Sequence, residues 1–113
     1  LSLLRAKVDE NLAEAFGLKA QKDELFLMGL FSVLDVILEK PMAEALKVVH
    51  VAGEISNALI YHIGVLAPVY DFMLQYETAN WAEVSRLMLL KNIDMNTVYE
   101  AYTSALKWYR TVR

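Results

Sequence analysis

The sequence predicts an all-α domain, and three observations support this. Apolar side chains recur at spacings of three and four along the whole chain. No β-branched alternating run bounded by turn residues indicates a strand. Hydrophobic residues make up 57% of the 113 residues against 22% that are charged, which supplies enough apolar surface for one buried core. We therefore expect residues 1–113 to form a single compact bundle of about six or seven helices.

Residues that start and stop helices divide the chain. Gly17 suits the left-handed conformation that closes a first helix. Asn80 followed by Glu83 forms a variant capping box, and Asp94 or Asn96 caps the last helix. The predicted helices are 1–16, 21–39, 41–49, 54–62, 65–77, 81–90 and a last one that runs to the C-terminus.

The second predicted helix, 21–39, is apolar almost all round, which is typical of a central helix. Gly29 and Ser32 form a notch of small residues where another helix can approach closely. Asp35 is the most notable carboxylate because it lies inside this apolar segment. We expect it to pair with an arginine or an amide at a helix junction rather than to act in catalysis.

Charge and composition exclude several classes of protein. A net charge of -3 gives no bulk attraction to nucleic acid or to an anionic membrane. The longest stretch without Asp, Glu, Lys or Arg, 55–70, contains Gly64 and Pro68 and is too short to span a bilayer as one helix. The absence of cysteine suits a reducing compartment, so we expect a cytoplasmic location. Since the chain starts with Leu1 inside a helical pattern, we expect it to be part of a longer protein.

The sequence contains no recognisable catalytic or metal site. His50 and His62 are the two histidines, and their spacing does not place both on one helical face. We interpret them as structural residues. The serines stand in no nucleophile motif, and the four glycines are too far apart to form a phosphate-binding loop. We therefore predict no enzyme activity, no cofactor and no metal.

The end of the last helix combines aromatic and basic side chains, which are Tyr99, Tyr102, Lys107, Trp108, Tyr109, Arg110 and Arg113. Such a set stacks on single-stranded nucleic acid in some proteins. Aromatic residues at helical spacing more often belong to a core, and aromatics with Arg are common anchors of protein interfaces. The candidate interaction or structural residues are Asp35, Trp81, Trp108, Tyr109 and Arg110.

The order of several motifs resembles the C-terminal part of an HDOD domain, above all the HDOD domains joined to EAL domains in bacterial cyclic di-GMP signalling proteins. The matching segments are Arg5-Ala6-Lys7, Leu12-Ala13-Glu14, Gly17-Leu18, 26–35 (FLMGLFSVLD), Pro41-Met42, Tyr76-Glu77 and Asn80-Trp81. Two segments depart from the pattern: Ala79-Asn80 replaces the usual Gly-Asp, and 51–54 replaces a helix start that usually bears Ser.

The resemblance implies an HD-like helical fold without the metal-binding set, a regulatory or output role, and an upstream EAL phosphodiesterase domain. None of the EAL motif lies in these residues, so the resemblance assigns no catalytic residue here. The leading hypothesis is a module that contacts a neighbouring domain, another signalling protein or a second copy of itself. The alternatives are a degenerate HD-type phosphohydrolase and a nucleic-acid-binding helical module.

Overall fold

The computed structural model describes residues 2–112, and within this range it is helical without a strand. The all-α prediction is confirmed. The elements are α1 (Ser2–Leu12), η1 (Lys19–Gln21), α2 (Lys22–Phe31), α3 (Leu34–Leu38), α4 (Met42–Ala45), η2 (Leu46–Val48), α5 (Gly53–Ser56), η3 (Asn57–Tyr61), α6 (Ala67–Glu77), α7 (Trp81–Lys91) and α8 (Met95–Val112).

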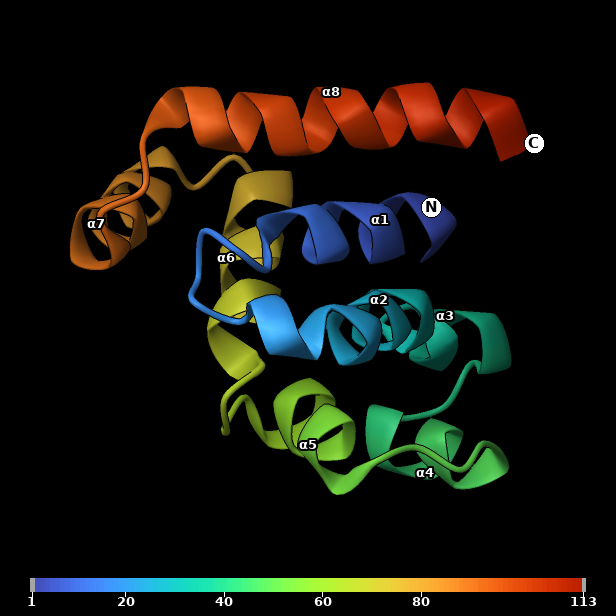
Figure 1. The fold of residues 1–113 in the computed structure, drawn as a ribbon. Helices are drawn as coiled ribbons and strands as arrows, with labels where there is room; N and C mark the ends of the chain where they lie inside the picture. Colours follow the sequence, from blue (N-terminus) through green and yellow to red (C-terminus); the bar gives the residue numbers. More distant parts are fainter. Residues whose placement is uncertain (1, 113) are drawn as a thin grey trace.

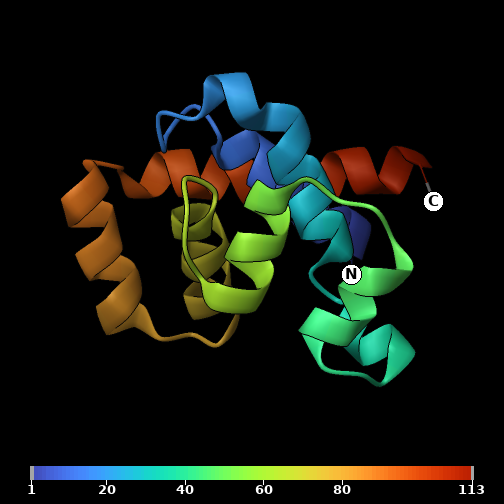
Figure 2. The same cartoon turned by 90° about the horizontal axis from the view of Figure 1, so that it is seen from below.

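Helix α1 occupies the middle of the fold (Figure 1). It packs between α2 and α8, and both neighbours run antiparallel to it. Helix α6 crosses behind this layer and also contacts α1. The view from below places α7 at one end of the molecule and the short helices α3 and α4 at the other (Figure 2).

Side chains from most of the helices form the core. The largest fully buried side chains are Phe72, Leu12, Leu25, Met28, Ile55, Leu66, Met73, Val8, Val69, Val84, Val98 and Asp9. All but Asp9 are apolar, as expected where burial of apolar surface is the main stabilising term. One carboxylate in the middle of this core therefore requires a separate explanation.

The closest approach of two helices occurs where α1 crosses α2. A Cβ atom built on Gly29 would lie 2.6 Å from the backbone Cα of Ala6. Only glycine fits that distance, because the obstructing atoms belong to the backbone and not to a flexible side chain. The notch predicted at Gly29 is confirmed, and α1 is the helix that occupies it.

Replacing Gly29 by Ala forces α1 and α2 apart, and we expect a loss of about 1–3 kcal/mol in the free energy of unfolding. Urea unfolding measures the loss. Gly53→Ala is the matched control, because a Cβ at this helical position meets nothing within 4 Å. We expect that control to change stability by less than about 1 kcal/mol. An equal loss in both variants would contradict the packing argument.

The continuous helix predicted over 21–39 is wrong, since the chain leaves the helix at Ser32 and Val33 between α2 and α3. The Ser32 hydroxyl donates to the Gly29 carbonyl oxygen at 2.7 Å. Arg5 Nη1 donates to Ser32 Oγ at 3.1 Å. The Ser32 hydroxyl bonds a carbonyl of the preceding turn, and Arg5 binds Ser32 from another helix. Together these two contacts interrupt the helical hydrogen bonds at this point.

Several of the predicted helix ends are confirmed by their caps. Gly17 has a φ of 70°, although α1 itself ends at Leu12 and a turn covers the residues between. Asn80 Oδ1 accepts from the Glu83 amide at 3.4 Å, and Asp94 Oδ1 accepts from the Thr97 amide at 2.8 Å. Asp94 is therefore the cap of α8.

Two other features of the backbone differ from a regular helical pattern. The helix predicted over 54–62 starts as α5 and continues as the π-helical segment η3, with His62 in the left-handed region after it. Ala79 has a φ of 57°, which glycine adopts at lower cost.

Along residues 2–112, every helix is too short or too polar to cross a lipid bilayer.

Candidate functional site

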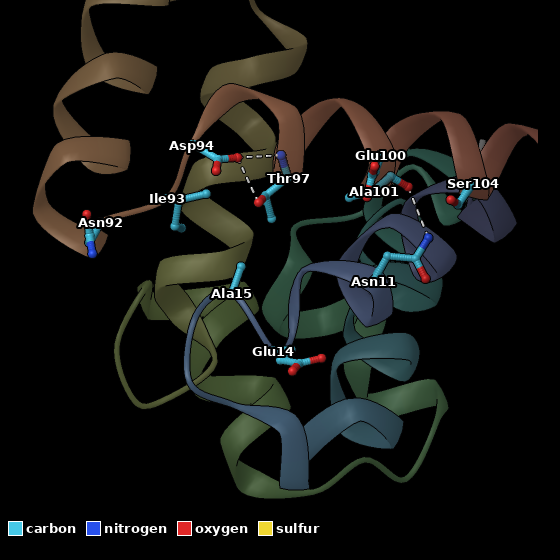
Figure 3. A pocket seen from close by; sticks show the side chains of 10 residues that line it. All are labelled: Asn11, Glu14, Ala15, Asn92, Ile93, Asp94, Thr97, Glu100, Ala101 and Ser104. Carbon is cyan, nitrogen blue, oxygen red and sulfur yellow. Dashed lines mark hydrogen bonds between the residues drawn. The ribbon is translucent and has the colours of Figure 1, made fainter.

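A hollow of about 510 Å³ lies where the end of α1 meets the start of α8 (Figure 3). Its lining residues are Asn11, Glu14, Ala15, Asn92, Ile93, Asp94, Thr97, Glu100, Ala101 and Ser104. The polar groups here serve local structure: Asn11 Nδ2 donates to the Ala101 carbonyl oxygen at 3.0 Å, and Thr97 Oγ1 donates to Asp94 Oδ1 at 2.9 Å. These contacts cap α8 and fasten α1 to it.

A second cluster of polar groups ties together α1, α2 and α6. Arg5 on α1 binds both oxygens of Glu77, the last residue of α6, through Nε at 2.9 Å and Nη2 at 2.5 Å. The two side chains are only 14% and 28% exposed. Arg5 Nη1 also reaches Ser32 beyond the end of α2. One guanidinium thus joins three helices through a bidentate ion pair and a hydrogen bond, the geometry that favours Arg over Lys.

Asp9, one turn after Arg5, is fully buried. Neither of its carboxylate oxygens has a hydrogen-bond partner within residues 2–112, and the same is true of the hydroxyl of Tyr102 on α8. Burial raises the pKa of the Asp9 carboxyl well above its usual value, Arg5 opposes that rise and Glu77 adds to it. Burial also raises the pKa of the Tyr102 phenol, with Asp9 as the second cause. The fold therefore favours an uncharged Asp9.

The polar groups of this cluster hold helices together. Arg5 and Glu77 satisfy each other, so neither is available as a general acid or base. A cavity of about 290 Å³ adjoins them and is lined mostly by apolar groups of Leu4, Val8 and Met73. Residues 2–112 contain no group of three or more His, Asp or Glu arranged to hold a metal ion.

Replacing Asp9 by Asn removes a group whose charged form is unfavourable in the fold. Folding raises the pKa of the Asp9 carboxyl. The contribution of this carboxyl to stability is therefore complete below its pKa in the unfolded chain, about 3.9, and is lost as the pH rises through its pKa in the folded chain. We expect the variant to equal the parent near pH 4 and to be about 1–3 kcal/mol more stable at pH 8.

Urea unfolding at a series of pH values measures this difference. Asp23→Asn makes the same change of charge at an exposed carboxylate and is the matched control. A gain from Asp9→Asn that does not depend on pH would contradict the assignment of a neutral buried carboxyl.

The structure separates the residues that the sequence singled out. Asp35 lies in the first turn of α3, at its junction with α2, where Oδ1 accepts from the Val36 amide at 2.9 Å. Trp81 begins α7, is 54% exposed and packs edge-on against Tyr76. Helices α3 and α7, to which these two residues belong, lie at different ends of the molecule (Figure 2).

The other three lie at the C-terminal end of α8. Trp108 packs edge-on against Phe26 of α2, and the Lys7 ammonium lies 5.2 Å from the centre of its ring. Tyr109 is half-buried and Arg110 is exposed. The Trp108 ring is therefore occupied by contacts within the chain, and Arg110 remains accessible to a partner.

The two histidines lie apart and in different settings. His50 is exposed in the connection between η2 and α5. His62 Nδ1 lies 2.6 Å from Asp71 Oδ1, and its ring stacks on Tyr70 with centroids 5.3 Å apart. The sequence analysis did not predict the His62–Asp71 pair, which depends on the loop between η3 and α6.

Sequence reasoning also missed Asp9 and the ion pair of Arg5 with Glu77. A signal for Asp9 was available, because Ala6, Asp9 and Ala13 fall on one helical face. The ion pair joins residues 72 positions apart, and helical periodicity carries no information about such a pair.

The sequence of this chain is similar to segments of larger bacterial proteins. The chain is 29% identical over 112 residues to the cyclic di-GMP phosphodiesterase CdgJ of Vibrio cholerae. It is 30% identical over 108 residues to the uncharacterized protein YuxH of Bacillus subtilis. The matches cover 99% and 96% of this chain but only 26% of each relative. No protein-family model matches the chain, and no solved structure matches it.

Proposed function

We propose that this chain is a non-catalytic regulatory or output module of bacterial signal transduction, of the HDOD class, that acts through protein–protein contacts in cyclic di-GMP signalling. The observation that carries the proposal is the similarity of nearly the whole chain to about a quarter of a cyclic di-GMP phosphodiesterase. A segment of that size is a domain within a larger signalling protein. The proposal includes the cytoplasm as its location and an EAL domain as its neighbour in the parent protein.

The arrangement of the titratable groups supports a role without catalysis. Arg5 and Glu77 are engaged with each other, and Asp9 is enclosed without access to a ligand. Among residues 2–112 the pair of His62 with Asp71 belongs to no group of three metal-binding side chains. An HD-type metal centre requires several imidazoles and carboxylates around one point. These contacts favour the regulatory proposal over the phosphohydrolase alternative.

The surface of α8 also weakens the nucleic-acid alternative. Stacking on bases needs a free aromatic face. Trp108 already packs on Phe26 and lies beneath Lys7. Lys107 and Arg110 supply exposed charge at this end of α8, but the Trp108 ring beside them is not free for stacking. Exposed arginines beside aromatic rings are common in protein interfaces.

The test compares cyclic di-GMP hydrolysis by the full-length parent protein with that by the same protein lacking residues 1–113. We expect the two rates to differ by at least about threefold, the low end of typical coupling between sites. The isolated chain supplied with Mg²⁺ or Mn²⁺ is expected to show no turnover. Circular dichroism establishes that all three proteins are folded.

A point variant provides a finer comparison than deletion. In the full-length protein, Trp81→Ala removes a large exposed ring and should reduce the regulatory effect without unfolding the module. Lys91→Ala on the same helix is the matched control. Turnover by the isolated chain would contradict a non-catalytic role. Equal rates with and without the module would rule out control of a neighbouring domain, and absence of hydrolysis in both would remove the cyclic di-GMP part of the proposal.

A further inference from the structure

Two carboxylates lie within reach of the Arg5 guanidinium, and only one of them is paired with it. Glu77 binds two of its nitrogens, at 2.9 and 2.5 Å. Asp9 follows Arg5 by four residues on α1, so the two side chains lie on one face of this helix, one turn apart. Side chains of a helix lean toward its N-terminus, which directs the Asp9 carboxyl toward Arg5.

The polar groups around Asp9 lack partners in this arrangement. Neither oxygen of its carboxyl is hydrogen-bonded within residues 2–112, although the residue is fully buried. The Tyr102 hydroxyl is likewise buried without a partner. Burial raises the pKa of the Tyr102 phenol, and Asp9 is the next cause, so the two groups lie near each other. Buried polar groups are normally paired. A second arrangement in which Asp9 accepts from donors accounts for both groups.

The contacts that Arg5 makes in the structure hold two junctions between helices. Its ion pair with Glu77 fastens the end of α6 to α1. Its bond to Ser32 Oγ, at 3.1 Å, lies where the chain leaves α2 before α3 begins. Asp9, in contrast, belongs to α1 itself. A guanidinium that turns to Asp9 therefore stays on α1 and releases both neighbouring helices.

Arg5 is the cation available to Asp9 within residues 2–112. Near Asp9, α6 contributes Tyr70 and Glu77 and α8 contributes Tyr102, none of which carries a positive charge. Helix α2 carries its charged side chains, Lys22, Asp23 and Glu24, in its first turn, at the end opposite Ser32. The other cations of α1, α2 and α8 are engaged or exposed, and they are Lys7, which pairs with Glu10, and Lys22, Lys107 and Arg110.

We propose that Arg5 exchanges partners, so that it binds Glu77 while Asp9 is neutral and binds Asp9 once that carboxyl has lost its proton. An unpaired buried charge is strongly unfavourable, so an ionised Asp9 requires a cation. Arg5 supplies the cation from one turn away, and Tyr102 supplies a hydroxyl donor. The Glu77 side chain is 28% exposed and is hydrated after its release. The exchange is a pH-dependent switch inside the fold.

The exchange reaches the surface through Ser32. After Arg5 leaves, Ser32 keeps its bond to the Gly29 carbonyl oxygen at 2.7 Å, a bond that serines also make inside continuous helices. The junction between α2 and α3 thus loses the contact that comes from another helix. Helix α3 carries Val36 and Ile37, which are 73% and 64% exposed. This apolar surface therefore moves with the ionisation of Asp9. The proposal is independent of the cyclic di-GMP role, because it depends only on contacts around α1.

Nuclear magnetic resonance of the 113-residue chain tests the exchange between pH 4 and pH 9. The side-chain carboxyl carbon of Asp9 reports its ionisation, and the Arg5 Nε resonance reports the partner of the guanidinium. We expect the resonances of Asp9, Arg5 Nε and the Ser32 amide to change with one midpoint, above the ordinary value of about 3.9. Circular dichroism verifies that the chain is folded at both ends of the range.

Two variants fix the two arrangements. Asp9→Asn keeps a neutral side chain at every pH, and we expect the Arg5 and Ser32 resonances to lose their response. Glu77→Gln removes the competing carboxylate, and we expect the midpoint of Asp9 to fall by at least about 1 pH unit, since a paired cation lowers a carboxyl pKa by about 1–3 units. Glu10→Gln, beside Asp9 on α1, is the matched control and should move that midpoint by less than about 0.5 units.

Three results would overturn the proposal. In the first, Asp9 ionises in the folded chain while Arg5 Nε and Ser32 stay unchanged, because Arg5 would then keep Glu77. In the second, the responses of Arg5 and Ser32 persist in Asp9→Asn, a comparison that does not depend on whether Glu77→Gln folds. In the third, the parent chain unfolds as Asp9 ionises, because no second folded arrangement would then exist.

Discussion

The ion pair between Arg5 and Glu77 sets the arrangement of the helices around α1. It fixes the end of α6 against the first turns of α1, and the remaining nitrogen of the same guanidinium reaches Ser32 where α2 stops. The chain then turns into α3 instead of continuing as one long helix. Because α1 also lies against Gly29 at backbone distance, it has little freedom to shift without breaking one of these contacts.

This constraint separates the side chains that hold the fold together from those that stay accessible at the surface. The Arg5–Glu77 ion pair is used inside the fold, and burial beside it raises the pKa of Asp9, which favours the uncharged form. Large apolar side chains remain exposed on several elements, among them Val36 on α3, Leu89 on α7 and Tyr99 on α8. Exposed large apolar side chains are typical of surfaces that bind other proteins, which agrees with the proposed regulatory role.

Local patterns predicted much of the fold. Helical spacing indicated the class, and Asn80 and Asp94 marked helix starts because each accepts from a neighbouring amide. Gly17 has the predicted left-handed φ, but α1 ends at Leu12, before the helix end predicted there. The break at Ser32 was missed because its cause includes Arg5, 27 residues away. The burial of Asp9 likewise depends on helices that meet only after folding. The sequence alone did not sort the aromatic residues of α8 into a buried face and an exposed one: Tyr102 stacks on Tyr76 within the fold, whereas Tyr99 is exposed.

The most direct test of this account is a double-mutant cycle between Arg5→Met and Glu77→Gln, with the free energy of unfolding measured for the parent, both single variants and the double variant. A partly buried bidentate pair that joins helices predicts a coupling energy of about 1–3 kcal/mol. Additive effects within about 0.5 kcal/mol would contradict the account, because they would mean that the two side chains stabilise the fold independently.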